Sequence, residues 1–141
     1  MAFTFPDSAR DAAITEATSL GDRVIACEGA PSSYSDADTL ASQGGHKVAE
    51  RTIDSATGYD GPNAETDGRS YDLEKGGYVA LETRNGSGEG VDHLAVVDDD
   101  AQAIVELYEV GDGNGDPVKM EKGIAYNNLS ITTTIGAVSA A

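Results

Sequence analysis

The run Asp112-Gly113-Asn114-Gly115-Asp116 has the best spacing for ligand chemistry in this chain. Oxygen donors alternate with glycines there, and alternating oxygens on a flexible loop suit Ca²⁺. A complete calcium loop would need a turn-forming Gly where Pro117 stands and a bidentate Glu where Gly123 stands. A polar turn is therefore the preferred interpretation, and Asp112, Asn114 and Asp116 are the alternative metal ligands. Asp98-Asp99-Asp100 has the same two interpretations, and a solvated turn is again preferred.

The other reactive residue types give no recognisable site. His46, His93 and the single Cys27 are too few and too scattered for a zinc centre. Cys27 ends the apolar run that begins at Val24, which predicts a small buried hydrophobe rather than a reactive thiol. His93 lies within a strand pattern, which favours a structural or interface role. No ordered nucleophile motif is present, so we expect neither an enzyme nor a cofactor.

The charge balance constrains the partners of this chain. It carries 25 Asp or Glu against 9 Lys or Arg, a formal net charge of −16. Such a surface repels phosphate, so we expect no nucleic acid partner. Its self-repulsion favours either a saline medium that screens the charge or an assembly with a basic partner. A merely soluble acidic surface remains open as the plainest alternative.

Period-two patterns predict a mainly β fold with one N-terminal helix. The helix is expected over 7–20, with Asp7 or Ser8 as its cap and Gly21 at its end. Its apolar face should comprise Ala9, Ala12, Ala13, Ile14, Ala17 and Leu20. Strands are predicted at 23–28, 47–53, 71–73, 78–84, 91–97, 103–110, 118–120 and 129–135.

The segments between these elements complete the expected domain. Residues 29–45 and 54–70 read as long polar loops, and Asn85-Gly86 as a turn between strands. We expect one antiparallel β-sandwich, jelly-roll-like, spanning 1–141 with short arms at 1–6 and 136–141. The N-terminus lacks the pattern of a signal peptide, and no run is long enough to span a bilayer. Synthesis in a cytoplasm and no membrane partner are therefore expected.

Three pieces together resemble a known type of virion protein. They are the 5–13 helix start followed by a strand and a Gly-Ala-Pro turn, the run Gly90 to Asp98, and the terminal strand Leu129 to Ile135. This order is similar to small β-rich structural proteins of tailed bacterial and archaeal viruses, which include head-decoration and tail-fibre proteins. The Asp-rich, Lys-poor balance also resembles proteins of extreme halophiles, which implies a halophilic or marine host.

The resemblance implies a capsid decoration, or cement, protein on the virion surface. Its partners would be the major capsid protein and copies of itself, as a trimer or another cyclic oligomer. The two arms are the expected contact segments, with Phe3 and Phe5 as anchors unless they fold onto the protein's own core. The partner-binding candidates are Phe3, Phe5, Pro6 and Val138. The alternatives are a tail, neck or fibre component, or a calcium- or carbohydrate-binding β-sandwich module.

Overall fold

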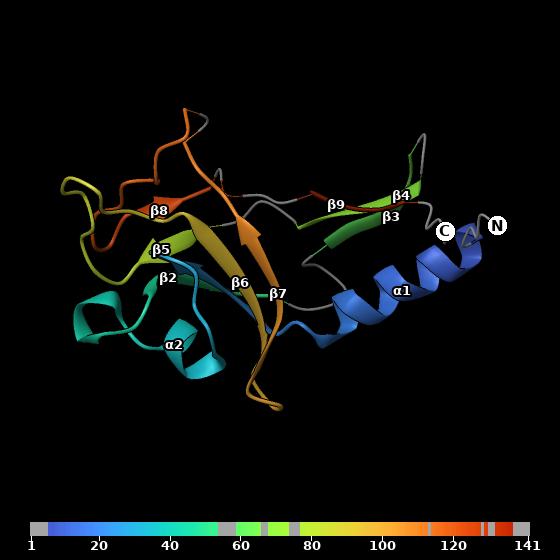
Figure 1. Cartoon of the computed structure of the whole chain (residues 1–141), viewed down its shortest axis with the longest axis horizontal. Helices are drawn as coiled ribbons and strands as arrows, with labels where there is room; N and C mark the ends of the chain where they lie inside the picture. The colour runs from blue at the N-terminus through green and yellow to red at the C-terminus, as the bar shows by residue number, and fades with distance from the viewer. Residues whose placement is uncertain are drawn as a thin grey trace, which may run out of the picture.

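The computed structural model describes residues 6–53, 59–65, 68–73, 77–112, 114–127, 129 and 132–136. Within them the chain forms two antiparallel sheets and few helical segments, as Figure 1 shows. The predicted mainly β class with one longer helix is therefore confirmed. Strand order and pairing do not establish two sheets packed face to face, so the jelly-roll-like sandwich stays a prediction.

The larger sheet has six strands in the order β7-β6-β1-β2-β5-β8. Its central strand is β1, which pairs with β2 on one side and with β6 on the other. The bounds are Arg23–Cys27 for β1, Lys47–Thr52 for β2, Tyr78–Ala80 for β5, His93–Asp98 for β6, Ala103–Glu109 for β7 and Ala125–Tyr126 for β8. Central β1 and β6 are almost wholly buried, whereas edge strand β7 is half exposed.

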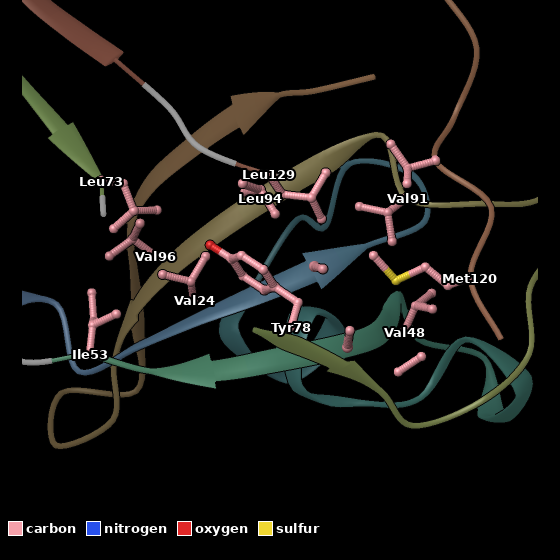
Figure 2. Packing of buried hydrophobic residues seen from close by; sticks show 14 residues of the cluster. Val24, Val48, Ile53, Leu73, Tyr78, Val91, Leu94, Val96, Met120 and Leu129 are labelled. Carbon is pink, nitrogen blue, oxygen red and sulfur yellow. The ribbon is translucent and has the colours of Figure 1, made fainter. Parts of the chain in front are cut away.

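Apolar side chains cover both faces of this sheet, because successive residues of a strand point to opposite faces. Val24, Val48 and Tyr78 belong to the larger cluster, which Figure 2 shows together with Leu73 and Leu129 from outside the sheet. Ile25 and Cys27 belong to a smaller cluster on the other face. Helix α2 (Tyr34–Asp38) covers that smaller cluster, to which it contributes the buried Ala37.

The smaller sheet carries the N-terminal helix. It consists of β3 (Tyr59–Glu65), β4 (Gly68–Leu73) and β9 (Thr132–Gly136), with β4 in the middle. Helix α1 (Asp7–Leu20) contacts all three strands and lies along this sheet in Figure 1. The predicted bounds of the helix are confirmed, including its end before Gly21. Its N-cap residue is Pro6, without a side-chain cap, instead of the predicted Asp7 or Ser8.

The predicted apolar face of α1 is wrong in its described part. Ala9, Ala12 and Ala13 are exposed, and Leu20 is 40% exposed, whereas the Arg10 side chain is only 8% exposed. A long aliphatic stem covers more of a neighbouring surface than a methyl group does, so Arg10 can occupy the buried side although it carries a charge.

Both predicted long loops contain regular structure. Residues 29–45 include α2 and the short 3-10 helix η1 (Ala41–Gln43), each too short to show a helical period. The stretch 54–70 contains β3 and the first half of β4. Gly61 and Pro62 belong to the predicted polar loop but lie in β3, an edge strand of its sheet with an irregular register between Asp60 and Asn63. Edge strands and bulges tolerate proline.

Several predicted strands are shorter or differently paired. β5 ends at Ala80, and the turn at Asn85-Gly86 does not close a hairpin, because β5 pairs with β2 and β8 and not with β6. Val118 and Met120 form only isolated bridges, to Val91 and Arg84 respectively. The strand expected over 129–135 appears as β9, and β8 had no sequence signal.

Candidate functional site

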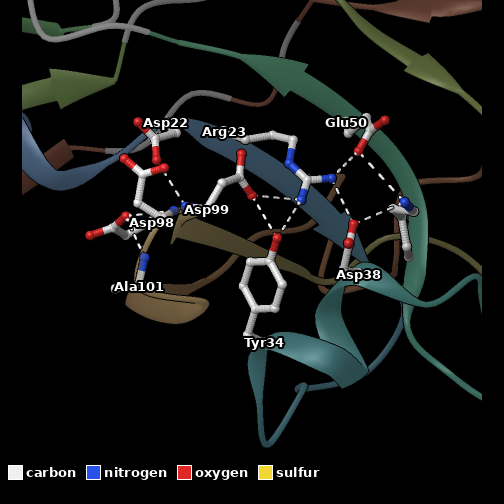
Figure 3. A network of polar contacts seen from close by, with 10 residues as sticks. Asp22, Arg23, Tyr34, Asp38, Glu50, Asp98, Asp99 and Ala101 are labelled. Atoms are coloured by element: carbon white, nitrogen blue, oxygen red, sulfur yellow. Dashed lines mark hydrogen bonds and ion pairs between the residues drawn. The ribbon is translucent and has the colours of Figure 1, made fainter.

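An ion-pair network centred on Arg23 occupies the face of the larger sheet that α2 covers (Figure 3). Arg23 Nη1 lies 2.6 Å from Asp38 Oδ1 and 2.6 Å from Glu50 Oε2, and Nη2 lies 2.8 Å from Asp99 Oδ1. The guanidinium thus joins β1 to α2, to β2 and to the turn after β6. A planar fork of donors suits several carboxylates at once, which a lysine could not match.

Two further residues complete the Arg23 network. Lys47 Nζ lies 3.0 Å from Asp38 Oδ1 and 3.7 Å from Glu50 Oε2. The hydroxyl of Tyr34 donates to Asp99 Oδ1 at 2.8 Å and accepts from Arg23 Nη2 at 3.2 Å. Three acids are therefore held by two cations and one phenol, in a place where the side chains of both cations are less than one fifth exposed.

The network favours the charged forms of Arg23, Asp38 and Asp99. Burial alone would raise the pKa of Asp38, but hydrogen bonds from Arg23 and Lys47 outweigh it, so the pKa is lowered. The pKa of Asp99 is lowered in the same way, by hydrogen bonds from Arg23 and Tyr34 that outweigh burial. Burial would lower the pKa of Arg23, yet its three acidic partners raise it. These groups stay ionised and fasten α2 to the sheet.

A second ion pair ties the loops at the other end of β1. Arg84 Nη2 contacts Glu28 Oε2, Arg84 Nε donates to Glu28 Oε1 at 3.2 Å, and the Gly90 N–H donates to the same oxygen at 2.8 Å. Burial opposes ionisation of Glu28, but these donors outweigh it and lower its pKa. Both networks stabilise the fold, since every acid in them contacts a hydrogen-bond donor of the same chain.

Three carboxylates gather at the start of β1 and the end of β6. Asp22, Asp98 and Asp100 each place an oxygen within 4.8 Å of the others. Such oxygens suit a hard cation. However, Asp22 Oδ2 accepts the Asp99 N–H at 2.8 Å, and Asp98 Oδ1 accepts from Asp100 and Ala101 at 3.1 Å each. These turn contacts explain the gathering and agree with the solvated turn preferred for Asp98 to Asp100. Sequence reasoning missed Asp22, because only β-strand pairing brings it beside Asp98.

The loop at Asp112 is built as a polar turn. Asp112 Oδ1 accepts the N–H of Asn114 at 2.7 Å and of Asp116 at 3.3 Å, and the Asp112 N–H donates to the Asp116 carbonyl at 3.0 Å. All three side chains are exposed. One of the two carboxylate oxygens of Asp112 therefore accepts hydrogen bonds from the backbone of its own loop.

A hollow of about 510 Å³ lies beside this loop. Its acidic side chains are Asp92, Glu109 and Asp116, and its other lining residues are Val110, Gly111, Gly115 and Pro117. No Lys, Arg or His is among these lining residues. The hollow joins the loop to the end of β7 and gives this end of the molecule a strongly anionic surface.

The histidines and the cysteine have structural roles. His46 Nδ1 lies 2.7 Å from the Glu28 carbonyl, and His93 Nδ1 lies 2.8 Å from Asp92 Oδ1. Among the described residues neither histidine belongs to a group of three possible metal ligands. Cys27 is fully buried, as predicted, and burial with the nearby Asp92 charge raises the pKa of its thiol to about 12. That thiol is inert at neutral pH.

The predicted contact residues are only partly covered by the structure. Pro6 is exposed, and its carbonyl accepts the N–H groups of Ala9 at 3.0 Å and Arg10 at 3.2 Å, so it starts α1. Phe3, Phe5 and Val138 lie outside the described residues. None of the helices in the described part of the chain is long and apolar enough to cross a membrane. Comparison with known protein families, with curated proteins and with solved structures found no match to this chain.

Proposed function

We propose that this protein is a capsid decoration protein, which binds the outer shell of a tailed virus through its acidic surface and strengthens the contacts between shell subunits. The partner is the basic surface of a major capsid protein, and the protein acts by adhesion without catalysis. The support is the order of sequence elements that resembles small virion proteins, together with the way the fold distributes its charge.

The observation that carries the proposal is that four of the cations in the described part of the chain are used for internal contacts. Arg23, Lys47 and Arg84 are each held by carboxylates of the same chain. Lys119 Nζ donates to the Glu89 carbonyl at 2.8 Å and also contacts the Gly86 carbonyl. Exposed acids are numerous, for example Asp100, Glu109, Asp112, Asp116 and Glu121. The anionic excess therefore faces outward, where a basic partner can neutralise it.

The two ion-pair networks support such a role mechanically. Arg23 fixes α2 against the sheet, and Arg84 fixes the loop at Gly90 to the end of β1. A body whose surface segments are already held in place loses little conformational entropy on binding. Cyclic self-association around a symmetry axis of the shell, with contacts from Phe3, Phe5, Pro6 and Val138, remains part of the proposal.

Two alternative functions are also proposed. A tail, neck or fibre component would have the same chemistry but few copies per particle. A cation-binding β module would use the Asp22, Asp98 and Asp100 carboxylates, which each place an oxygen within 4.8 Å of the others. A rise in melting temperature with Ca²⁺ but not with Mg²⁺ would support that module.

Rebinding to stripped particles tests the proposal. Virions that contain this protein would be stripped of it at low salt, and purified protein would then be added back. The proposal predicts saturable rebinding and recovery of resistance to heat-induced opening of the shell. Acidic proteins of similar charge, as the matched control, should not restore resistance. Failure to rebind to the shell, or rebinding only at the tail, would contradict a decoration role.

A further inference from the structure

Strand β7 forms one edge of the larger sheet. Among the described residues β7 pairs with β6 alone, and it is seven residues long, whereas β8 at the opposite edge has two. Figure 1 shows β7 on the side of β6 that faces away from β5 and β8. An edge of this length presents a row of backbone donors and acceptors that can pair with another strand.

Little in the sequence of β7 prevents such pairing. Natural edge strands are usually blocked by charged side chains, above all lysine, by proline or by a bulge. β7 contains neither lysine nor proline, and its register irregularity lies near its start, opposite Val96 and Val97. Its charged residues are Glu106 and Glu109, which disfavour an acidic partner strand and favour a basic one. From Glu106 to Glu109 the pairing with β6 is regular. Leu107 is 41% exposed, and Ile104 and Val105 are partly exposed, so an added strand would find apolar side chains beside it.

The surroundings of β7 define the charge of its partner. Residues 85–118 contain nine Asp or Glu and no Lys or Arg. The turn before the strand carries Asp98 to Asp100, and the hollow after it is lined by Asp92, Glu109 and Asp116. A second copy of this chain would bring the same acids and a net charge of −16 against this edge. Like charges across a strand pair are destabilising, so self-pairing through β7 is disfavoured.

We infer that β7 is a docking edge for an extended, basic segment of a partner protein, which adds to the larger sheet as a further antiparallel or parallel strand. Backbone hydrogen bonds supply the affinity, and Lys or Arg side chains of the segment meet the acids at the two ends of β7. The inference rests on the proposed function for the identity of that partner, whereas the pairing itself can be tested with purified protein.

The probe is an end-blocked peptide of the repeating sequence Thr-Lys-Val-Lys, eight residues long, titrated into the full chain by calorimetry. The control is a peptide of the same sequence in which alternate backbone amides are N-methylated. The methyl groups remove the hydrogen-bond donors along one edge of the peptide strand and leave its charge unchanged. We expect the N-methylated peptide to bind at least about tenfold more weakly, because a few hydrogen bonds are lost. Hydrogen exchange of the β7 amides should slow only with the unmodified peptide.

A matched pair of variants locates the site. Leu107→Lys places a blocking lysine on β7, and Val79→Lys places the same charge on β5, which is paired on both sides. Leu107 and Val79 are similarly exposed, at 41% and 46%. We expect Leu107→Lys to weaken peptide binding about tenfold and Val79→Lys to change it less than about twofold. Circular dichroism checks that both variants are folded.

The result that would overturn the inference is equal binding of the two peptides, or equal loss in the two variants, which would indicate diffuse charge attraction. No peptide binding at low salt would overturn it as well. If this protein binds the peptide through β7 but is absent from virions, the proposed function is wrong and the docking edge stands. If this protein is present in virions but does not bind the peptide, the docking edge is wrong and the proposed function stands.

Discussion

The Arg23 guanidinium at the start of β1 lies 2.6 Å from the Asp38 carboxylate at the end of α2. This pair closes the gap between a sheet strand and a helix only five residues long, which has little stability of its own. The Arg23 side chain is 16% exposed, so the charges are partly shielded from water. The contact therefore stabilises the face of the sheet that contains Cys27.

Removing the Arg23 charge should destabilise the fold. Arg23→Met leaves Asp38, Glu50 and Asp99 close together without their common cation. We expect the free energy of unfolding to fall by about 2–4 kcal/mol, because a broken, partly buried ion pair leaves charges uncompensated. Chemical denaturation measures this loss. Lys122→Met removes one exposed cation with no described ion pair and should cost less than about 0.5 kcal/mol. Equal losses would show that net charge, and not the network, sets the effect.

Acid should destabilise the protein through the same carboxylates. The folded-state pKa values of Asp38, Asp99 and Glu28 are lowered from ordinary values of 3.8 for Asp and 4.5 for Glu. Their stabilisation is therefore complete above those ordinary values and is lost as the pH falls through the lowered ones. We expect stability, measured in molar salt to screen general repulsion, to decline below about pH 4. Arg23→Met should flatten this decline, and an unchanged slope in that variant would contradict the assignment.

Gly45 should tolerate no side chain. A Cβ at this position would lie 2.1 Å from the Thr39 carbonyl oxygen, closer than real atoms approach. We expect Gly45→Ala to reduce the melting temperature by at least about 5 °C, through displacement of the segment that follows α2. Gly44→Ala is the matched control. Its Cβ would meet nothing within 4 Å, and its φ of +88° costs about 1 kcal/mol in strain. A larger loss for Gly44→Ala would contradict the close contact.

Cys27 should be unreactive in the folded protein. Its thiol is fully buried, and its pKa is raised to about 12, so almost no thiolate exists at pH 8. We expect alkylation by iodoacetamide, followed by mass spectrometry, to require urea. Ser87→Cys places a thiol on an exposed loop and serves as the reactive control. Rapid native labelling of Cys27 itself would show that the α2 face opens readily.

Salt should raise stability if the acidic surface is adapted to a saline medium. With a net charge of −16, repulsion acts over about 10 Å at 0.1 M salt and over about 3 Å at 1 M. We expect the melting temperature to rise between low and molar KCl, and to rise less in a variant in which Asp100 and Glu121 are changed to Lys. Comparable stability at low and molar salt would argue against a halophilic setting and leave the partner-binding explanation of the charge.

The sequence predicted elements well where one period dominates. The helix at 7–20 was recognisable from its helical spacing, and the strands now seen as β1, β2, β6 and β7 from short runs or alternations of apolar, β-favouring residues. The α1 face was predicted wrongly, since spacing alone cannot show that the stem of Arg10 outcompetes alanine for a buried position. β3 was missed because Gly61 and Pro62 usually mark a turn.

The candidate site was largely beyond sequence reasoning. Arg23 contacts Asp38, Glu50 and Asp99, which are brought together by strand pairing and by α2, and no local spacing indicates this. The sequence did indicate that the run starting at Asp112 is a turn and that Cys27 is buried, because both follow from neighbouring residues. The sequence could not show that unpaired acids face the solvent, because this depends on which acids form ion pairs with Lys and Arg in the folded chain.

Quantitative mass spectrometry of purified virions from the source of this sequence tests whether the protein decorates the shell. A decoration role predicts on the order of hundreds of copies per particle, because a shell repeats its binding sites by symmetry. Loss of those copies at low salt should coincide with loss of shell stability. Absence of the protein from every particle, or a handful of copies confined to the tail, would contradict it.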